Sequence, residues 1–150
     1  ISNLLLNDTL DEGRALLDLD TMAHLSIPVE MGDAFRSWCN PSGEDESQAT
    51  FRADIFTAAM AGYSDGTRAM LTREEVDSLV LGAETIALEL AARFCADALN
   101  EAYFGWNARK FPSRTEHNRI RALSQLSVAQ SVRTQRASLE QVVQAAYARG

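Results

Sequence analysis

Apolar residues recur with two different spacings along the chain, and these spacings predict a short β-type opening followed by a long helical remainder. Two short apolar runs, residues 4–6 and 15–19, lie on either side of a polar segment that contains Gly13. Short apolar runs that flank a polar turn with a glycine are typical of a β-hairpin with a longer loop. The opening residues therefore predict two antiparallel strands.

From residue 29 onward the apolar residues repeat every three to four positions, which is the spacing of a helix with one buried face. The segment before it ends in Pro28 and predicts an extended surface loop. Three segments of the form Ser/Thr-x-x-Glu/Gln are capping boxes, which satisfy free N–H groups at a helix start. The expected helices run over residues 29–39, from about Thr50 to Gly66, over 73–100, from Ser113 and, as a separate last helix, from Ser138.

The predicted fold class is mainly α with one small β-hairpin, in a single domain over residues 1–150. A hydrophobic content of 46% in 150 residues is enough to form one core. Cys39 and Cys95 fall in predicted helices without C-x-x-C spacing, which argues against zinc and a disulfide framework and is typical of a reducing cytoplasm. No apolar stretch is long enough to span a membrane, so we expect a cytoplasmic protein without a membrane partner.

The net charge of −7 is unevenly distributed. Residues 1–100 contain 6 Lys/Arg and 18 Asp/Glu, whereas residues 101–150 contain 8 and 3. An acidic majority repels phosphate backbones, so nucleic acid is not expected as a partner. We interpret the basic charge of residues 101–150 mainly as solvated helix faces, and the alternatives are packing on the acidic half or contacts with phosphates. The acidic loop 42–47 is interpreted as solvated. His24 is interpreted as structural or exposed, and His117 as exposed.

Oxygen-bearing side chains gather at the open end of the predicted hairpin. Asn3 precedes the first strand, and Asp18 and Asp20 end the second. Residues two apart on a strand point the same way, so the two carboxylates can face one spot near Asn3. Such ligands suit Mg²⁺. The alternative is that these side chains bond nearby backbone groups, as Asp and Asn commonly do at turns.

Three segments resemble one known family: Ser2-Asn3-Leu4-Leu5-Leu6, Leu16-Leu17-Asp18-Leu19-Asp20-Thr21 and Met31-Gly32-Asp33-Ala34-Phe35-Arg36. They are similar to the part of aminoglycoside-phosphotransferase-type kinases that follows the catalytic Asp. In that family a loop of pattern HxDxxxxN is followed by a hairpin, whose second strand ends in a metal-binding Asp. Within this family, the sequences of the second and third segments are most similar to those of sugar kinases that phosphorylate N-acetylhexosamines at the anomeric carbon. The resemblance is weaker beyond about residue 40.

The resemblance implies the helical C-terminal lobe of a protein-kinase-like phosphotransferase, with ATP and Mg²⁺ as cofactors. Asn3 matches the loop Asn, Asp18 matches the metal Asp, and Asp20 falls where many members carry another acid. The His and Asp of the catalytic loop are absent from the sequence, which opens inside the motif. We therefore expect a fragment that is inactive alone, without a catalytic residue of its own, whose N-terminal lobe holds the nucleotide site and the base.

The resemblance also implies roles for three further residues. Asp33 would support the catalytic loop from behind, while Arg93 and Tyr103 would bind sugar hydroxyls. The alternative for Arg93 is a surface ion pair with Glu89 or Asp97, each four residues away. Aminoglycosides, choline-like alcohols and homoserine compete with sugars as acceptors. A non-enzymatic helical interaction module, which binds a partner through its basic C-terminal helices, is the alternative from another class.

Overall fold

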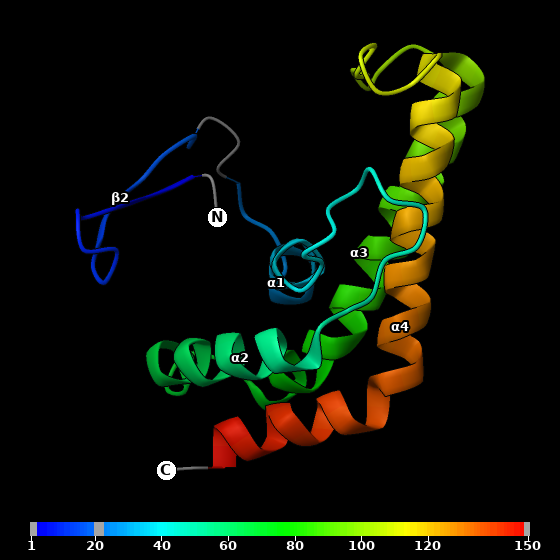
Figure 1. Cartoon of the computed structure of the whole chain (residues 1–150). Helices are drawn as coiled ribbons and strands as arrows, with labels where there is room; N and C mark the ends of the chain where they lie inside the picture. The colour runs from blue at the N-terminus through cyan, green and yellow to red at the C-terminus, as the bar shows by residue number, and fades with distance from the viewer. Residues whose placement is uncertain (1–2, 20–22, 149–150) are drawn as a thin grey trace.

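The computed structural model describes residues 3–19 and 23–148, and it is mainly helical with one small two-stranded sheet. The predicted fold class is thus confirmed at this level. Figure 1 shows the hairpin standing to one side of the helices. The elements are β1 (Leu4–Leu6), β2 (Gly13–Leu16), α1 (Ile27–Trp38), α2 (Ala53–Thr67), α3 (Arg73–Asn100) and α4 (Arg114–Ala148).

The predicted hairpin is present, but its second strand begins and ends earlier than expected. β1 and β2 pair antiparallel, with Leu4 opposite Leu16 and a register shift between Leu5 and Leu6. The second strand cannot extend to Leu19 because Asp18 has a φ of 61°, in the left-handed region that interrupts extended backbone. The strand therefore stops just before the candidate metal residue.

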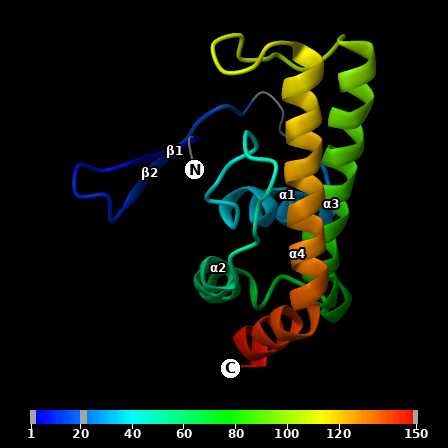
Figure 2. The same cartoon turned by 45° about the vertical axis from the view of Figure 1, so that its right-hand side comes forward.

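Two long helices, α3 and α4, run side by side and form the main support of the molecule (Figure 2). α3 begins where the capping box predicts: Thr72 Oγ1 accepts from the Glu75 N–H, and Glu75 Oε2 accepts from the Thr72 N–H. It ends at Glu101, whose φ of 50° reverses the chain into the loop formed by residues 101–113. This loop, called loop 101–113 below, leads back into α4.

The prediction of two closing helices is wrong, because α4 is continuous through Ser138. Ser113 does cap its start, since its Oγ accepts from the Glu116 N–H at 3.0 Å. Ser138 instead donates its hydroxyl to the Gln135 carbonyl at 2.7 Å. A hydroxyl bonded back into the preceding turn does not cap a new helix, and such bonding often bends the helix that contains it. Figure 1 shows α4 changing direction in its last third, toward α2.

α1 packs across α3 at a contact between two glycine backbones. A Cβ on Gly32 would lie 2.6 Å from the carbonyl carbon and oxygen of Gly82. A Cβ on Gly82 would meet the backbone of Pro28, lying 2.9 Å from its carbonyl carbon and closer still to its oxygen. Pro28 lies in the first turn of α1, and the prediction of an extended loop up to this residue is wrong there. The fixed φ of proline suits the first turn of a helix.

The hydrophobic core lies where the four helices meet. α2 contributes Phe56 and Met60 to it, in line with the apolar repeat of the sequence, and the rings of Phe35 and Phe56 meet edge to face at 4.9 Å. α2 starts at Ala53 rather than near Thr50, without a side-chain cap. The reason is tertiary: the Phe51 N–H donates to Ser131 Oγ on α4, and its carbonyl accepts from Gln135. These bonds hold the backbone of Phe51 outside the helix.

Candidate functional site

The structure brings together an amide and a carboxylate at the base of the hairpin. Asn3 Nδ2 donates to Asp18 Oδ2 at 3.2 Å, and both residues are exposed. The Leu17 N–H donates to the Asn3 carbonyl at 2.8 Å, which continues the strand pairing up to this point. The predicted convergence of Asn3 and Asp18 is therefore confirmed. The third predicted ligand, Asp20, lies outside the described residues.

The reason that the sequence offers for this convergence needs correction. Asp18 lies beyond β2 in a left-handed conformation, so the strand alternation that was expected to align it with Asp20 does not apply to it. Its carboxylate reaches Asn3 because the backbone turns there. Aspartate and asparagine tolerate this conformation better than most residues, since their short polar side chains bond locally.

The Asn3–Asp18 pair is suited to supply the protein ligands of a magnesium site. Among the described residues, no group of three or more His, Cys, Asp and Glu side chains could hold a metal ion. Mg²⁺, however, keeps several waters and is commonly bound through one or two carboxylates together with substrate phosphates. One carboxylate beside one amide, both open to solvent, is compatible with that kind of coordination.

Asp33 is exposed on α1 and orients an arginine. Arg36 donates to Asp33 Oδ1 from Nε at 2.9 Å and from Nη2 at 2.7 Å, and its Nη1 donates to Glu44 at 2.9 Å. The predicted role of Asp33 concerns a catalytic loop that the given sequence does not contain, and it stays a prediction. What Asp33 does within the described residues is to hold the Arg36 guanidinium in place.

Arg93 and Tyr103, the predicted sugar-binding pair, lie together at the end of α3. The guanidinium carbon of Arg93 is 5.5 Å from the centre of the Tyr103 ring and 5.4 Å from that of Phe104, which is cation–π distance. Arg93 Nε also lies 3.6 Å from Glu89 Oε1, so the surface ion pair is present as well. The residues line a hollow of about 400 Å³.

Asp97 shapes this end of the molecule, and sequence reasoning missed its role. Its buried carboxylate accepts from the backbone N–H groups of residues 102–104 at 2.7 to 2.9 Å and from Asn118 Nδ2 at 2.9 Å. Burial raises its pKa, but the N–H donors of Tyr103, Phe104 and Ala102 outweigh burial and hold the pKa below its usual value. The sequence did contain one signal of this role: an acid in the last turn of a helix is disfavoured by the helix dipole, so its presence there needs a compensating set of donors.

The interpretation of His117 as exposed is wrong, and that of loop 42–47 as solvated holds only in part, because residues 42, 43 and 46 are exposed while Glu44, Asp45 and Ser47 are half-buried. His117 is buried and stacks on Phe111 at 4.0 Å. Its Nδ1 accepts from the Asn107 N–H, so Nε2 carries the proton and donates to Asp45 Oδ1 at 2.8 Å. This bond, together with Lys110, holds the pKa of Asp45 below its usual value despite partial burial. Loop 42–47 is thus anchored to α4.

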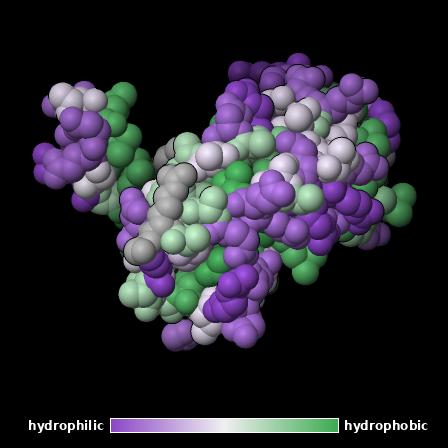
Figure 3. Space-filling view, turned by 90° about the horizontal axis from the view of Figure 1, so that it is seen from below, coloured by the Kyte–Doolittle hydropathy of each residue, from purple (hydrophilic) through white to green (hydrophobic). Residues whose placement is uncertain are grey.

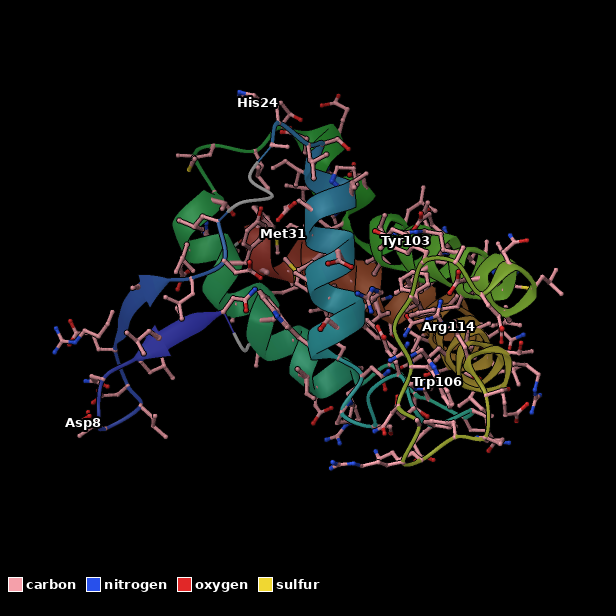
Figure 4. The ribbon with its side chains drawn as sticks, turned by 90° about the horizontal axis from the view of Figure 1, so that it is seen from above. Asp8, His24, Met31, Tyr103, Trp106 and Arg114 are labelled. Carbon is pink, nitrogen blue, oxygen red and sulfur yellow. The ribbon has the colours of Figure 1, made fainter. Side chains whose placement is uncertain are left out.

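The two predicted pairs are not brought together in space. The hairpin and loop 101–113 lie on opposite sides of α1, as Figures 1 and 4 show, with Asp8 at the far end of the hairpin and Tyr103 and Trp106 beyond α1. The structure therefore contains two separate candidate sites. One is the Asn3–Asp18 pair at the hairpin base, and the other surrounds loop 101–113.

The hairpin also exposes a number of large apolar side chains. Leu5, Leu10 and Leu16 are 50%, 73% and 68% exposed, and Figure 3 shows apolar surface along the hairpin. Contiguous apolar surface of this kind is typical of an interaction site.

None of the helices in residues 23–148 has both the length and the apolar character needed to cross a membrane. Comparison with models of known protein families gives no match.

Proposed function

We propose that this chain is the helical lobe of an ATP-dependent phosphotransferase that acts on a small-molecule hydroxyl, and that this hydroxyl belongs to a sugar such as an N-acetylhexosamine. The observation that carries the proposal is the 3.2 Å contact between Asn3 and Asp18. These two residues are the ones that the resemblance assigns to the metal. They come from opposite arms of the hairpin, fifteen positions apart in the sequence.

In this proposal Asp18 and Asn3 hold the Mg²⁺ that accompanies the nucleotide. Asp20 would be an auxiliary ligand. Phosphoryl transfer depends on positioning and charge neutralisation more than on covalent chemistry, and bound Mg²⁺ supplies the neutralisation at the phosphates. The side chains of this chain bind and orient; the catalytic base is expected in the N-terminal lobe. The exposed leucines of the hairpin would contact that lobe.

The proposal is tested by nucleotide binding in the intact protein. We expect Asp18→Asn to weaken Mg²⁺-dependent ADP binding by about tenfold or more in isothermal titration calorimetry, because the metal loses its carboxylate. Asp8→Asn is the matched control, since it makes the same charge change at the far end of the same hairpin (Figure 4). Equal binding by Asp18→Asn and the control would refute the proposal. A screen of sugars, aminoglycosides, choline and homoserine then identifies the acceptor.

The alternative interaction module depends on free basic side chains in the C-terminal third. Several described arginines of α4 are instead engaged within the chain. Arg133 and Arg136 both pair with Glu84, a buried carboxylate on α3, and Arg119 pairs with Glu116. Packing of the basic end on the acidic half, one of the interpretations left open by the sequence, therefore accounts for part of this charge. These pairs leave fewer unpaired basic side chains for the alternative module than the sequence suggests, although Arg133 and Arg119 are still 65% and 54% exposed.

A further inference from the structure

A second cleft lies on the other side of Phe104 from the Arg93–Tyr103 hollow. It is a broad, open cleft with a volume of about 620 Å³, lined by residues of α1, α3, α4, the loop after α1 and loop 101–113. We name it the Trp106 cleft, after the indole that lines it (Figure 4). Small-molecule sites in proteins commonly have volumes of roughly 300–1,000 Å³. The cleft is thus large enough for a monosaccharide-sized ligand.

The wall formed by α3 and loop 101–113 is apolar and aromatic. Leu90 and Phe94 of α3 are buried, and the ring of Phe94 packs on that of Phe104 at 4.4 Å. Trp106 contributes an indole that is 37% exposed, so one part of it is packed and another remains accessible. An aromatic surface that is fixed yet accessible suits a ligand with one flat apolar face.

The polar groups that line the cleft are held rigidly by their neighbours. Arg36 is only 12% exposed and is bound to both Asp33 and Glu44. Arg121 donates from Nη1 to the Gly105 carbonyl at 2.8 Å, and its guanidinium lies 5.5 Å from the centre of the Phe94 ring. Planar donors that are already ordered lose little freedom when they bind a ligand.

One buried donor at the cleft lacks an acceptor. Arg121 Nε is buried and makes no hydrogen bond with any residue in 3–19 or 23–148; its ion-pair partner, Asp45 Oδ1, is 3.9 Å away. Buried polar groups are nearly always hydrogen-bonded, and an unmatched one calls for a specific explanation. Because Nε itself is inaccessible to solvent, a ligand oxygen would reach it only if the Arg121 side chain moved, whereas the rest of this side chain is 20% exposed and lines the cleft.

The charges around the cleft nearly balance. Arg36 and Arg121 line it together with Glu44, while Asp33 and Asp45 neutralise the two arginines from outside. A balanced set of donors and acceptors has no strong preference for an anion or a cation. It favours a neutral ligand whose groups both donate and accept hydrogen bonds.

We propose that the Trp106 cleft binds a neutral sugar. A pyranose ring combines an apolar C–H face, suited to the Trp106 and Phe104 rings, with a rim of hydroxyls, suited to Arg36, Glu44 and Arg121. The cleft is argued from its own side chains and needs neither nucleotide nor metal. Only the choice of N-acetylhexosamines as first probes rests on the proposed function.

The test is sugar binding by this chain without nucleotide or Mg²⁺. N-acetylglucosamine, N-acetylgalactosamine and glucose are titrated by saturation-transfer NMR and calorimetry, with adenosine and glucose 1-phosphate as aromatic and anionic comparators. We expect at least one neutral sugar to bind more tightly than both comparators. Trp106→Ala and Arg121→Met should each weaken binding by about tenfold, and Trp106→Phe should retain most of it.

The matched control is Arg119→Met, two residues from Arg121 on the same helix, whose guanidinium pairs with Glu116 and does not line the cleft; it should leave sugar binding unchanged. Circular dichroism identifies variants that fail to fold; if Arg121→Met does, the contrast between Trp106→Ala and Trp106→Phe decides. No saturable sugar binding, tighter binding of adenosine or glucose 1-phosphate, or an equal loss in Arg119→Met would overturn the proposal. Because nucleotide is absent, failure here is distinct from failure of the Asp18→Asn test.

Discussion

The contact between α1 and α3 gives a sharp stability prediction at Gly82. Alanine is favoured over glycine inside a helix by about 1 kcal/mol, so Gly82→Ala would stabilise α3 if its Cβ had room. It has none, because the Cβ would lie 2.9 Å and 3.0 Å from the carbonyl carbon and Cα of Pro28, where ordinary contacts are 3.4–4 Å. The atoms it meets are backbone, which cannot rotate away. The helices must therefore separate.

Forced overpacking of this kind costs roughly 1–3 kcal/mol, and separation also loosens buried neighbours such as Phe35. Because every contact of the new Cβ is with backbone, we take the upper part of that range, about 2–3 kcal/mol; subtracting the helix-propensity gain of about 1 kcal/mol leaves a net loss of about 1–2 kcal/mol in the free energy of unfolding. For a chain of this size that corresponds to a decrease in Tm of roughly 2–8 °C.

The control for this prediction is Gly62→Ala in α2, where an added Cβ has nothing within 4 Å. This variant should gain up to about 1 kcal/mol, because only helix propensity acts. Urea unfolding followed by circular dichroism measures both. If Gly82→Ala were as stable as Gly62→Ala, the close approach of α1 and α3 would be wrong.

Three further predictions concern polar groups that are buried or partly buried. Glu84→Gln should lower the free energy of unfolding by about 2 kcal/mol, which is less than the loss of a fully buried ion pair because the partner Arg133 is 65% exposed. Urea unfolding measures the loss, and an unchanged stability would refute the pairing. The lowered pKa of Asp97 means that its stabilisation is complete above the unfolded value near 3.8 and is lost as the pH falls through the folded value. Asp97→Asn should therefore be less stable than wild type near pH 6, with a difference that shrinks below about pH 4; a constant difference would contradict this. Asp45→Asn should weaken the bond from His117 and lower amide-exchange protection in residues 42–47 by about 1 kcal/mol, with Glu46→Gln in the same loop as control, and equal protection would contradict the anchoring.

Much of the fold could be predicted because its signals are local. The capping box at Thr72 and the apolar repeat after it set both ends of α3, and the apolar runs around Gly13 predicted the hairpin. The convergence of Asn3 and Asp18 could be expected for the same reason, since a hairpin brings its two arms together whatever surrounds it. Arg93 and Tyr103, which the resemblance assigns to one sugar pocket, also lie close in sequence, and the structure places the Arg93 guanidinium over the Tyr103 ring; their role toward a sugar stays a prediction.

Signals of the same strength failed where other hydrogen bonds compete with them. Ser138 has the local pattern of a helix start, yet its hydroxyl bonds back into α4 and the helix continues. Thr50 lies where a cap was expected, but Ser131 and Gln135 of α4 bind the backbone of Phe51 and delay the start of α2. At Thr50 the tertiary environment outweighed a local preference of comparable size, whereas at Ser138 the competing bond is itself local, three residues back in the same helix.

The sequence by itself determined the order of hairpin and helices and their approximate bounds, because hydrogen-bonding patterns, caps and apolar spacing act over a few residues. Only the tertiary structure decided which polar groups are buried. His117 is buried because Asp45, seventy-two positions earlier, accepts the hydrogen bond from its Nε2, and Glu84 is buried because α4 carries two arginines to it. A charged or polar side chain can leave water only when its partner arrives, and that partner is chosen by how the helices pack.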